Sequence, residues 1–273
     1  MPELPEVETV RRSLDPLVCG RRVCDVEVRC AALRRPLPAD FASRLEGARL
    51  VATSRRAKYL LLRLDSGKSW IVHLGMSGRF QHEADRDLYS PTTHDHVIAR
   101  LDDGAALVFN DPRRFGLMVL DYAEQSPLLA DIGPEPLDRT SFHGGYLALQ
   151  KRRTRRTIKD VLMDQHVVAG LGNIYVNEIL FLAGVRPRRR MPRVSTAECE
   201  RIVDATRSVI SEAIEHRGSS ISDFLDGVGR RGGYQWRRRV YDRADEPCQE
   251  CAAPIKCIIV GQRSSFYCPR CQR

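Results

Sequence analysis

Four cysteines near the end of the chain have the spacing of metal ligands. Cys248 and Cys251 form one Cys-x2-Cys pair, and Cys268 and Cys271 form a second pair after sixteen intervening residues. Two such turns supply the four thiolates of a tetrahedral Zn²⁺ site with no open position, so the pattern predicts one structural Zn²⁺. Two disulfides or a chance arrangement are the alternatives. Cys257 lies between the pairs and is predicted to be a small buried hydrophobic residue.

The first residues of the chain offer a second kind of chemistry. Removal of Met1, which the small Pro2 permits, leaves a secondary amine, and an α-amino group titrates at a pKa of about 7.7–8.0. Such an amine is partly neutral at physiological pH and can attack an aldehydic sugar carbon to give an iminium ion. Glu3 is then a candidate general acid or base, with Glu6 one helical turn away. Taken alone, these residues favour the alternative, an ordinary helix cap.

Positive charge is concentrated in the second half of the chain. The segments 151–156, 186–193 and 230–239 each hold five basic residues, 15 of the 44 lysines and arginines. One such run is more often a solvated face, but three runs and a basic four-cysteine tail favour a phosphate-binding surface. The turn 170–173 (Gly-Leu-Gly-Asn) precedes a predicted helix whose N-terminal amides suit a DNA phosphate, although Gly-x-Gly is often only a tight turn.

These groups need a scaffold. In the first half of the chain, the pattern predicts one helix followed by an antiparallel β domain. Val7, Val10 and Leu14 recur at helical spacing and predict a helix over residues 5–20. Between residues 23 and 122, short aliphatic runs are separated by turns, and 102–104 (Asp-Asp-Gly) is a hairpin signal. Short strands without long helices between them predict two antiparallel sheets.

The second half is predicted to be helical. Helices are expected over 157–163, 174–183 and 196–216, the last opened by a capping box of Ser195 and Glu198. Residues 226–239 have no apolar period and are interpreted as a mobile loop. The fold class is therefore predicted as α+β, with an N-terminal helix and antiparallel two-sheet β-sandwich at 1–130, a helical DNA-binding domain at 131–239 beginning with a proline-rich linker, and a zinc-ribbon β-hairpin at 240–273.

Composition limits the class of protein. The chain has 273 residues, 42% of them hydrophobic, and a formal net charge of +9. This charge favours a polyanionic partner, with nucleic acid first and an anionic membrane surface second. The apolar stretches are too short to span a bilayer, and no basic-then-apolar leader opens the chain. With the cysteines clustered instead of spread as a disulfide framework, we expect a cytoplasmic protein.

Seven motifs run in order along the whole chain. They are 2–9 (PELPEVET), 55–61 (RRAKYLL), 73–78 (HLGMSG), 111–116 (DPRRFG), 133–137 (GPEPL), 172–175 (GNIY) and 262–268 (QRSSFYC). Together they closely resemble the formamidopyrimidine-DNA glycosylase family. The sister family, endonuclease VIII, typically has glycine at the position of Leu4, so the purine-directed branch is favoured.

This resemblance implies a monomeric, bifunctional base-excision repair enzyme of the bacterial cytoplasm, associated with the nucleoid through duplex DNA. It would remove 8-oxoguanine and formamidopyrimidines and then cleave the backbone by β,δ-elimination. By the same resemblance Pro2 is the nucleophile that forms a Schiff base at the sugar C1′, Glu3 the proton donor, and Lys58 a contact to phosphate near the lesion. Glu6 and Glu178 would hold the N-terminus in place.

The resemblance also implies how the DNA is held. Asn173 and Arg263 would grip the phosphates at the lesion, which makes the middle domain a helix–two-turn–helix element. Met76, Arg113 and Phe115 match the residues that fill the space left by the everted base, and Arg114 would meet phosphate. From sequence alone, Met76 and Phe115 are instead expected to be core residues at strand ends.

The chain departs from the family pattern at three places. Asp242 stands where glycine is usual, so the chain entering the ribbon is expected to run differently; Ser222 replaces a lysine found in some members; and the loop 226–234 has its own arrangement of arginines and glycines. These departures affect lesion preference. An endonuclease VIII-like enzyme for oxidised pyrimidines and a non-catalytic zinc-containing protein that binds damaged DNA stay open as alternatives.

Overall fold

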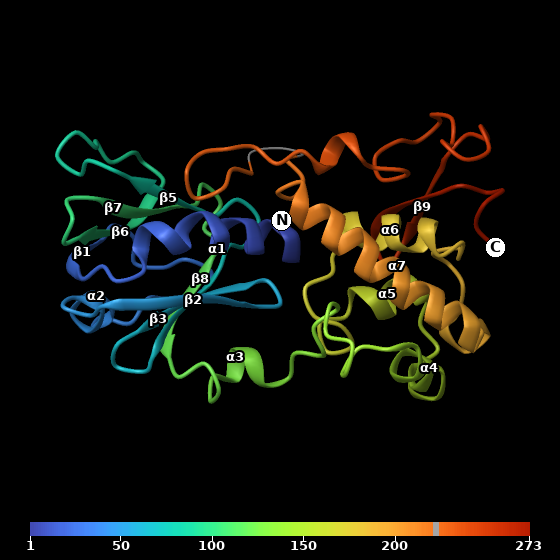
Figure 1. Cartoon of the computed structure of the whole chain (residues 1–273), viewed down its shortest axis with the longest axis horizontal. Helices are drawn as coiled ribbons and strands as arrows, with labels where there is room; N and C mark the ends of the chain where they lie inside the picture. The colour runs from blue at the N-terminus through green and yellow to red at the C-terminus, as the bar shows by residue number, and fades with distance from the viewer. Residues whose placement is uncertain (221–223) are drawn as a thin grey trace. The chain divides into compact units, whose positions relative to one another are not determined.

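The structure is a computed structural model that describes residues 1–220 and 224–273. It divides into two compact units (Figure 1). Unit 1 comprises Met1–Asp131 and His216–Gly233, and unit 2 comprises Ile132–Glu215 and Tyr234–Arg273. The segment His216–Gly233 thus packs with the N-terminal part of the chain. The division into three domains at residues 131 and 240 stays a prediction.

Unit 1 contains two four-stranded antiparallel sheets, as predicted. One has the order β1-β6-β7-β5, and the other has the order β2-β3-β4-β8. The first sheet is formed by β1 (Val23–Val28), β6 (Asp95–Leu101), β7 (Ala106–Asn110) and β5 (Arg79–Glu83), and the second by β2 (Leu50–Arg56), β3 (Tyr59–Leu64), β4 (Ser69–His73) and β8 (Leu117–Asp121). Strands β6 and β7 pair through the turn at 102–104, which confirms the hairpin signal.

The core of unit 1 lies between its sheets and one helix. Trp70 of one sheet meets Phe80 of the other with ring centroids 5.4 Å apart. Helix α1 (Leu4–Val18) adds Val7, Val10 and Leu14, all fully buried, and each such side chain contributes about 1.5–3 kcal/mol on leaving water. Two short helices, α2 (Phe41–Leu45) and α3 (Pro127–Ala130), complete the unit. The packing anchors α1 firmly, so its N-terminus has a defined place.

Unit 2 is built on four helices, α4 (Gly144–Arg153), α5 (Ile158–Met163), α6 (Asn173–Leu182) and α7 (Thr196–Glu215), with a 3-10 turn η1 (Met191–Arg193). The capping box of α7 is confirmed, because Ser195 and Glu198 exchange backbone-to-side-chain hydrogen bonds of 2.7 and 3.1 Å. Helix α4 was not predicted. Its cap is His143, whose Nδ1 accepts the Tyr146 amide at 3.2 Å, and few of its residues are apolar.

The C-terminal part of unit 2 is a small hairpin of β9 (Lys256–Val260) and β10 (Arg263–Tyr267). Its apolar cluster includes Ile255 and Phe266, with Phe181 of α6 packed against them. The predicted α+β fold with a terminal hairpin is confirmed. Within the described ranges, none of the helices has the length and hydropathy needed to cross a bilayer.

The prediction of a mobile loop over 226–239 does not hold for its second half. Residues Tyr234–Trp236 form the 3-10 turn η2, and Tyr234 is fully buried against Tyr175 with ring centroids 5.3 Å apart. Arg237 and Arg239 each form an ion pair of 3.1 Å with Glu212. A single buried aromatic residue anchors this segment, and one residue leaves no periodic signal in a sequence.

Candidate active site and DNA-contact loops

The N-terminus of unit 1 brings two carboxylates to the start of α1. Pro2 is buried, and Glu3 and Glu6 are only 3% and 2% exposed. The Glu3 amide donates to Glu6 Oε2 at 2.9 Å, which is one half of a capping box. The pKa of the Met1 amine, at the N-terminus of the structure, is lowered below 8.0 by burial, although Glu3 and Glu6 oppose the shift; the positive charges of Lys58 and Arg113 add to it. Glu3, Glu6 and Lys58 therefore lie close enough to the N-terminus to influence the charge of an amine there.

Glu6 also links this end of the helix to a distant segment. Its other oxygen, Oε1, accepts the amide of Ser219 at 2.7 Å. Gly218 precedes that amide with φ +72°, and a Cβ there would lie 2.7 Å from the same carboxylate oxygen. Since both the left-handed backbone and the close approach require glycine, Glu6 fixes the N-terminus and the segment His216–Gly233 together.

A second anchor of that segment lies further along α1. The amide of Gly227 donates to Ser13 Oγ at 2.9 Å, and its carbonyl accepts the His82 amide at 2.9 Å. Asp226 closes the turn that follows, because its Oδ1 accepts the amides of Val228 and Arg230 at 3.0 and 2.8 Å. Ser222 lies outside the described residues.

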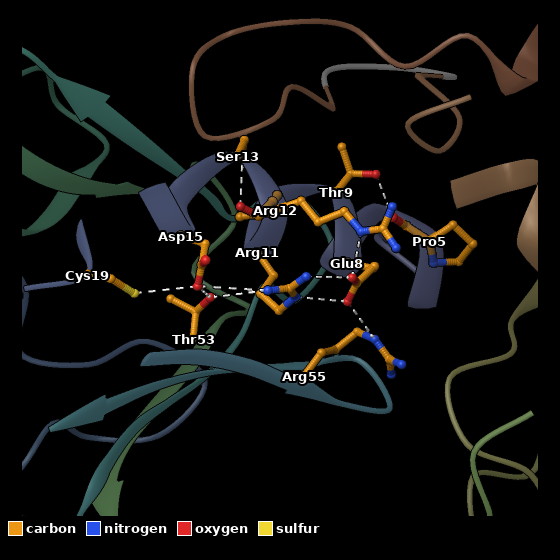
Figure 2. Close-up of polar contacts among 11 residues, drawn as sticks. Pro5, Glu8, Thr9, Arg11, Arg12, Ser13, Asp15, Cys19, Thr53 and Arg55 are labelled. Atoms are coloured by element: carbon orange, nitrogen blue, oxygen red, sulfur yellow. Dashed lines mark hydrogen bonds and ion pairs between the residues drawn. The ribbon is translucent and has the colours of Figure 1, made fainter. Parts of the chain in front are cut away.

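Lys58 lies in the tight turn between β2 and β3, and residues of α1 contact this turn through Arg55. Ala57 has φ +52°, and its carbonyl accepts Arg55 Nη1 at 2.9 Å. The Nε atom of Arg55 lies 3.5 Å from Glu8 Oε2, and both side chains are 12% exposed. Figure 2 shows Arg55 on β2 reaching toward Glu8, which also accepts hydrogen bonds from Arg11 and Arg12. Helix α1 therefore sets both the N-terminal amine and the turn that carries Lys58.

Two loops of unit 1 project the residues predicted to fill the space of an everted base. Met76 is 43% exposed and Phe115 is 45% exposed, so the expectation that they are core residues is wrong. The Arg113 guanidinium lies over the Phe115 ring, 4.8 Å from its centroid. Arg114 beside them is exposed, with φ +54°. Apolar side chains at the tips of tight loops are free to enter a base step.

Unit 2 places the two predicted phosphate contacts around one carbonyl. Asn173 is the first residue of α6, and its Nδ2 donates to the Ser264 carbonyl at 3.1 Å. Arg263 is the neighbour of Ser264 in β10 and is exposed. The fully buried Lys159 donates to the same carbonyl at 2.9 Å. Asn177 adds a bond of 2.7 Å from the Phe266 amide, so the hairpin and the start of α6 form one surface.

Glu178 is fully buried in α6 and binds backbone amides. Its two oxygens accept the amides of Arg239, Val240 and Tyr241 at 2.7, 3.0 and 2.8 Å. Burial raises the pKa of this carboxyl, while the three amides act in the opposite direction. Glu178 thus fixes the chain where it enters the hairpin module. Its predicted role of holding the N-terminus stays a prediction.

The four cysteines of the two pairs converge. The Sγ atoms of Cys248, Cys251, Cys268 and Cys271 all lie within 4.8 Å of one another. Four thiolates at this separation suit a tetrahedral Zn²⁺ with no open position, so the site fits one structural zinc. Cys257 is exposed on β9 and outside the cluster, so its predicted burial is wrong. A β-strand with one solvated face leaves alternate residues outside, and Cys257 falls on that face.

Comparison with known proteins decides the family. Family models match three stretches of the chain: the formamidopyrimidine-DNA glycosylase N-terminal domain over 1–118, its helix–two-turn–helix domain over 132–225, and the zinc finger found in this family and in isoleucyl-tRNA synthetases over 245–273. Formamidopyrimidine-DNA glycosylases of Dinoroseobacter shibae and Thiobacillus denitrificans are 47% and 48% identical, each covering 100% of both chains. The chain belongs to the formamidopyrimidine-DNA glycosylase family.

Solved structures of formamidopyrimidine-DNA glycosylases have the same fold. The MutM (Fpg) protein of Thermus thermophilus has a TM-score of 0.86 at 38% identity, covering 99% of this chain and 98% of that one. A Lactococcus lactis Fpg mutant in complex with DNA containing Fapy-dG has a TM-score of 0.91 at 32% identity, covering 100% of both chains. The L. lactis enzyme with abasic-site DNA has a TM-score of 0.91 at 32% identity, covering 99% of both.

One departure from the formamidopyrimidine-DNA glycosylase pattern has a simple structural answer. Asp242 stands at the usual glycine with φ +60°, a left-handed conformation that glycine takes freely and aspartate tolerates. Arg238 lies 3.6 Å from its carboxylate. The expectation that the chain runs differently at this point stays a prediction. Sequence reasoning missed Asp111, Arg55 and Lys159 as parts of the site; the first two lie inside the motifs at 111–116 and 55–61.

Proposed function

We propose that this chain is a bifunctional base-excision repair enzyme that removes oxidised purines from duplex DNA and then cleaves the abasic site. Its relatives are formamidopyrimidine-DNA glycosylases, and the L. lactis structures hold DNA with Fapy-dG and with an abasic site, the substrate and the product of the first reaction. The observation that carries the proposal is the buried Pro2 at the start of α1, next to the buried carboxylates of Glu3 and Glu6.

In the proposed reaction the neutral secondary amine of Pro2 attacks C1′ of the damaged nucleotide. The C1′–N9 bond breaks, and the bond electrons leave with the base, which takes up a proton. Glu3 donates a proton to O4′ as the sugar ring opens, and the amine nitrogen and C1′ share a double bond as an iminium ion. The iminium draws electrons from C2′, so loss of a C2′ proton expels the 3′ phosphate. A further elimination expels the 5′ phosphate.

The remaining predicted site residues hold the DNA in this scheme. Lys58 meets phosphate near the lesion, Asn173 and Arg263 grip the phosphates from unit 2, and Arg114 adds a phosphate contact. Met76, Arg113 and Phe115 fill the vacated space. The structural zinc, bound by the four cysteines, stabilises the hairpin that carries Arg263. The enzyme acts as a monomer in the bacterial cytoplasm, on DNA of the nucleoid.

Borohydride trapping tests the function and the nucleophile together. A duplex with 8-oxoguanine opposite cytosine is mixed with the enzyme and borohydride, and the cross-linked peptide is mapped by mass spectrometry. We expect one adduct on Pro2, lost in Pro2→Gly and in protein that retains Met1. Pro16→Ala, which removes an exposed proline from the same helix, is the control and should trap normally.

Other outcomes redirect the proposal. Tight binding without any adduct would identify a non-catalytic protein that binds damaged DNA. Trapping with an oxidised pyrimidine alone would keep the chemistry and replace the purine substrate. An adduct on another residue would remove Pro2 from its role.

A further inference from the structure

The two loops that carry Met76, Arg113 and Phe115 are joined by one buried carboxylate. Asp111 Oδ1 accepts the Ser77 hydroxyl at 2.6 Å, and Oδ2 accepts the Gly116 amide at 2.7 Å. The Ser77 Oγ in turn accepts the amide of Arg113 at 3.2 Å. Ser77 follows Met76 in the chain, Gly116 follows Phe115, and the third bond is to Arg113 itself. Asp111 and Ser77 therefore connect all three residues.

The backbones of the two loops also touch. Gly75 has φ +65°, and a Cβ there would lie 2.3 Å from the Phe115 carbonyl carbon. The Gly75 amide donates to His73 Nδ1 at 2.9 Å, and burial lowers the pKa of His73 to about 4, so this ring is neutral and able to accept at physiological pH. There is no space between the loops for a side chain, and their relative position is therefore fixed.

Burying the carboxylate of Asp111 is unfavourable for stability. It is 0% exposed, and among the described residues no lysine, arginine or histidine forms an ion pair with its carboxylate. A buried carboxylate costs stability unless hydrogen bonds compensate it, and here its side-chain bonds come from the two loops. Its backbone carbonyl also accepts His96 Nε2 at 2.9 Å and the Arg114 amide at 3.1 Å. The two side-chain hydrogen bonds of Asp111 therefore hold the two loops together.

We propose that Asp111 and Ser77 are positioning residues that fix Met76, Arg113 and Phe115 relative to one another before DNA binds. Their main effect is to aim the Arg113 guanidinium, which lies on the Phe115 ring, at the base left without a partner. This inference rests on the proposed function, because it assigns the aim of the same three residues. It concerns discrimination between opposite bases, not the bond-breaking steps at C1′.

Ser77→Ala is the sharpest test, because it removes one hydroxyl from a half-buried loop residue. Ser77→Thr keeps the hydroxyl, and Ser69→Ala, a serine 4% exposed at the start of β4, is the matched control. The readout is the ratio of 8-oxoguanine excision rates opposite cytosine and opposite adenine. A good contact between an arginine and a base discriminates by roughly 5- to 150-fold, and we expect Ser77→Ala to reduce the wild-type ratio at least about fivefold. Ser77→Thr should restore most of it, and Ser69→Ala should leave it unchanged.

A second measurement does not depend on catalysis. A duplex with a tetrahydrofuran abasic analogue and 2-aminopurine opposite it reports insertion of the three residues as a fluorescence change on binding. We expect a smaller and slower change with Ser77→Ala and with Asp111→Asn, while thermal unfolding confirms that both variants are folded. The Ser69→Ala signal should match that of the wild type.

The outcomes separate the two proposals. Absence of excision by the wild-type enzyme would reject the proposed function, and the fluorescence signal would still judge the positioning role. Equal base ratios and equal fluorescence in Ser77→Ala and Ser69→Ala would overturn the positioning role while excision stands. A wild-type enzyme without preference between cytosine and adenine would overturn the assigned aim of Arg113.

Discussion

The carboxylate of Glu6 accepts the backbone amide of Ser219 at 2.7 Å, across 213 positions of the chain. The same carboxylate holds the Glu3 amide at 2.9 Å. One side chain therefore links the start of α1 to the segment His216–Gly233. We expect a substitution at either end of this link to shift the position of the proposed nucleophile, Pro2.

Gly218→Ala tests this link. The added methyl group would lie 2.7 Å from Glu6 Oε1 on a backbone with φ +72°. We expect the free energy of unfolding to fall by at least about 1 kcal/mol and the excision rate to fall by about tenfold or more, because the carboxylate must move. Gly20→Ala is the control, since Gly20 has φ +87° and nothing within 4 Å of a Cβ. If both variants lose activity equally, backbone strain alone explains the effect.

Arg55→Met tests the support of Lys58. Removing the guanidinium takes one hydrogen bond from the Ala57 carbonyl in the turn with φ +52°, so we expect Lys58 to be held less firmly. We expect a decrease of about tenfold in single-turnover excision, with thermal stability lowered by only about 1–2 kcal/mol. Arg12→Met removes another arginine that binds Glu8 but does not touch this turn. A loss of rate in Arg12→Met as large as that in Arg55→Met would show that the charge on Glu8, not the turn, is what matters.

The pH dependence of borohydride trapping reports the N-terminal amine. Burial lowers the pKa of the Met1 amine below 8.0, and we expect the same surroundings to lower the pKa of the Pro2 amine once Met1 is removed, which leaves more of the neutral, nucleophilic form at pH 7. We expect the trapping rate to rise with pH and to reach half its maximum below pH 8.0. Glu3 and Glu6 oppose the shift, so Glu6→Gln should move the midpoint to still lower pH. A midpoint above pH 8.0 in the wild-type protein contradicts the effect of burial.

Zinc removal should weaken DNA binding without altering the amine. The hairpin carries Arg263, and its Ser264 carbonyl accepts hydrogen bonds from Asn173 and Lys159, so unfolding the hairpin would destroy the proposed phosphate-binding surface of unit 2. We expect Cys268→Ser or chelation to lower duplex affinity at least about tenfold and to flatten the dependence of log K on log salt. Cys257→Ser, at an exposed cysteine outside the cluster, should change neither. Full affinity in zinc-free protein would remove the hairpin from the DNA contact.

Strong local patterns predicted much of this fold. The periodicity of α1, the turn at 102–104 and the capping box of Ser195 and Glu198 each depend on neighbouring residues, and each is confirmed. The four-cysteine cluster was predictable for the same reason. Helix α4 was missed because it has a histidine cap and little apolar character.

Long-range contacts could not be predicted from neighbouring residues. Met76 and Phe115 have the composition of core residues, and only the tight loops around Gly75 and Asp111 leave them exposed. The hydrogen bonds between Glu6 and Ser219 and between Lys159 and Ser264 join positions far apart in the chain, so no local sequence pattern predicts them. The motifs indicated which segments contain functional residues, but they did not predict which side chains contact one another.

The link between Asp111 and Ser77 has a consequence for how intact DNA is searched. Loops whose shape is already fixed lose little conformational entropy when they insert into DNA. The free energy needed for insertion would then come mainly from deforming the duplex. On the proposed function, we therefore expect undamaged and damaged base pairs to be distinguished first by how easily the duplex deforms. The proposed contact between Arg113 and the unpaired base would then form only after the damaged base has left the stack.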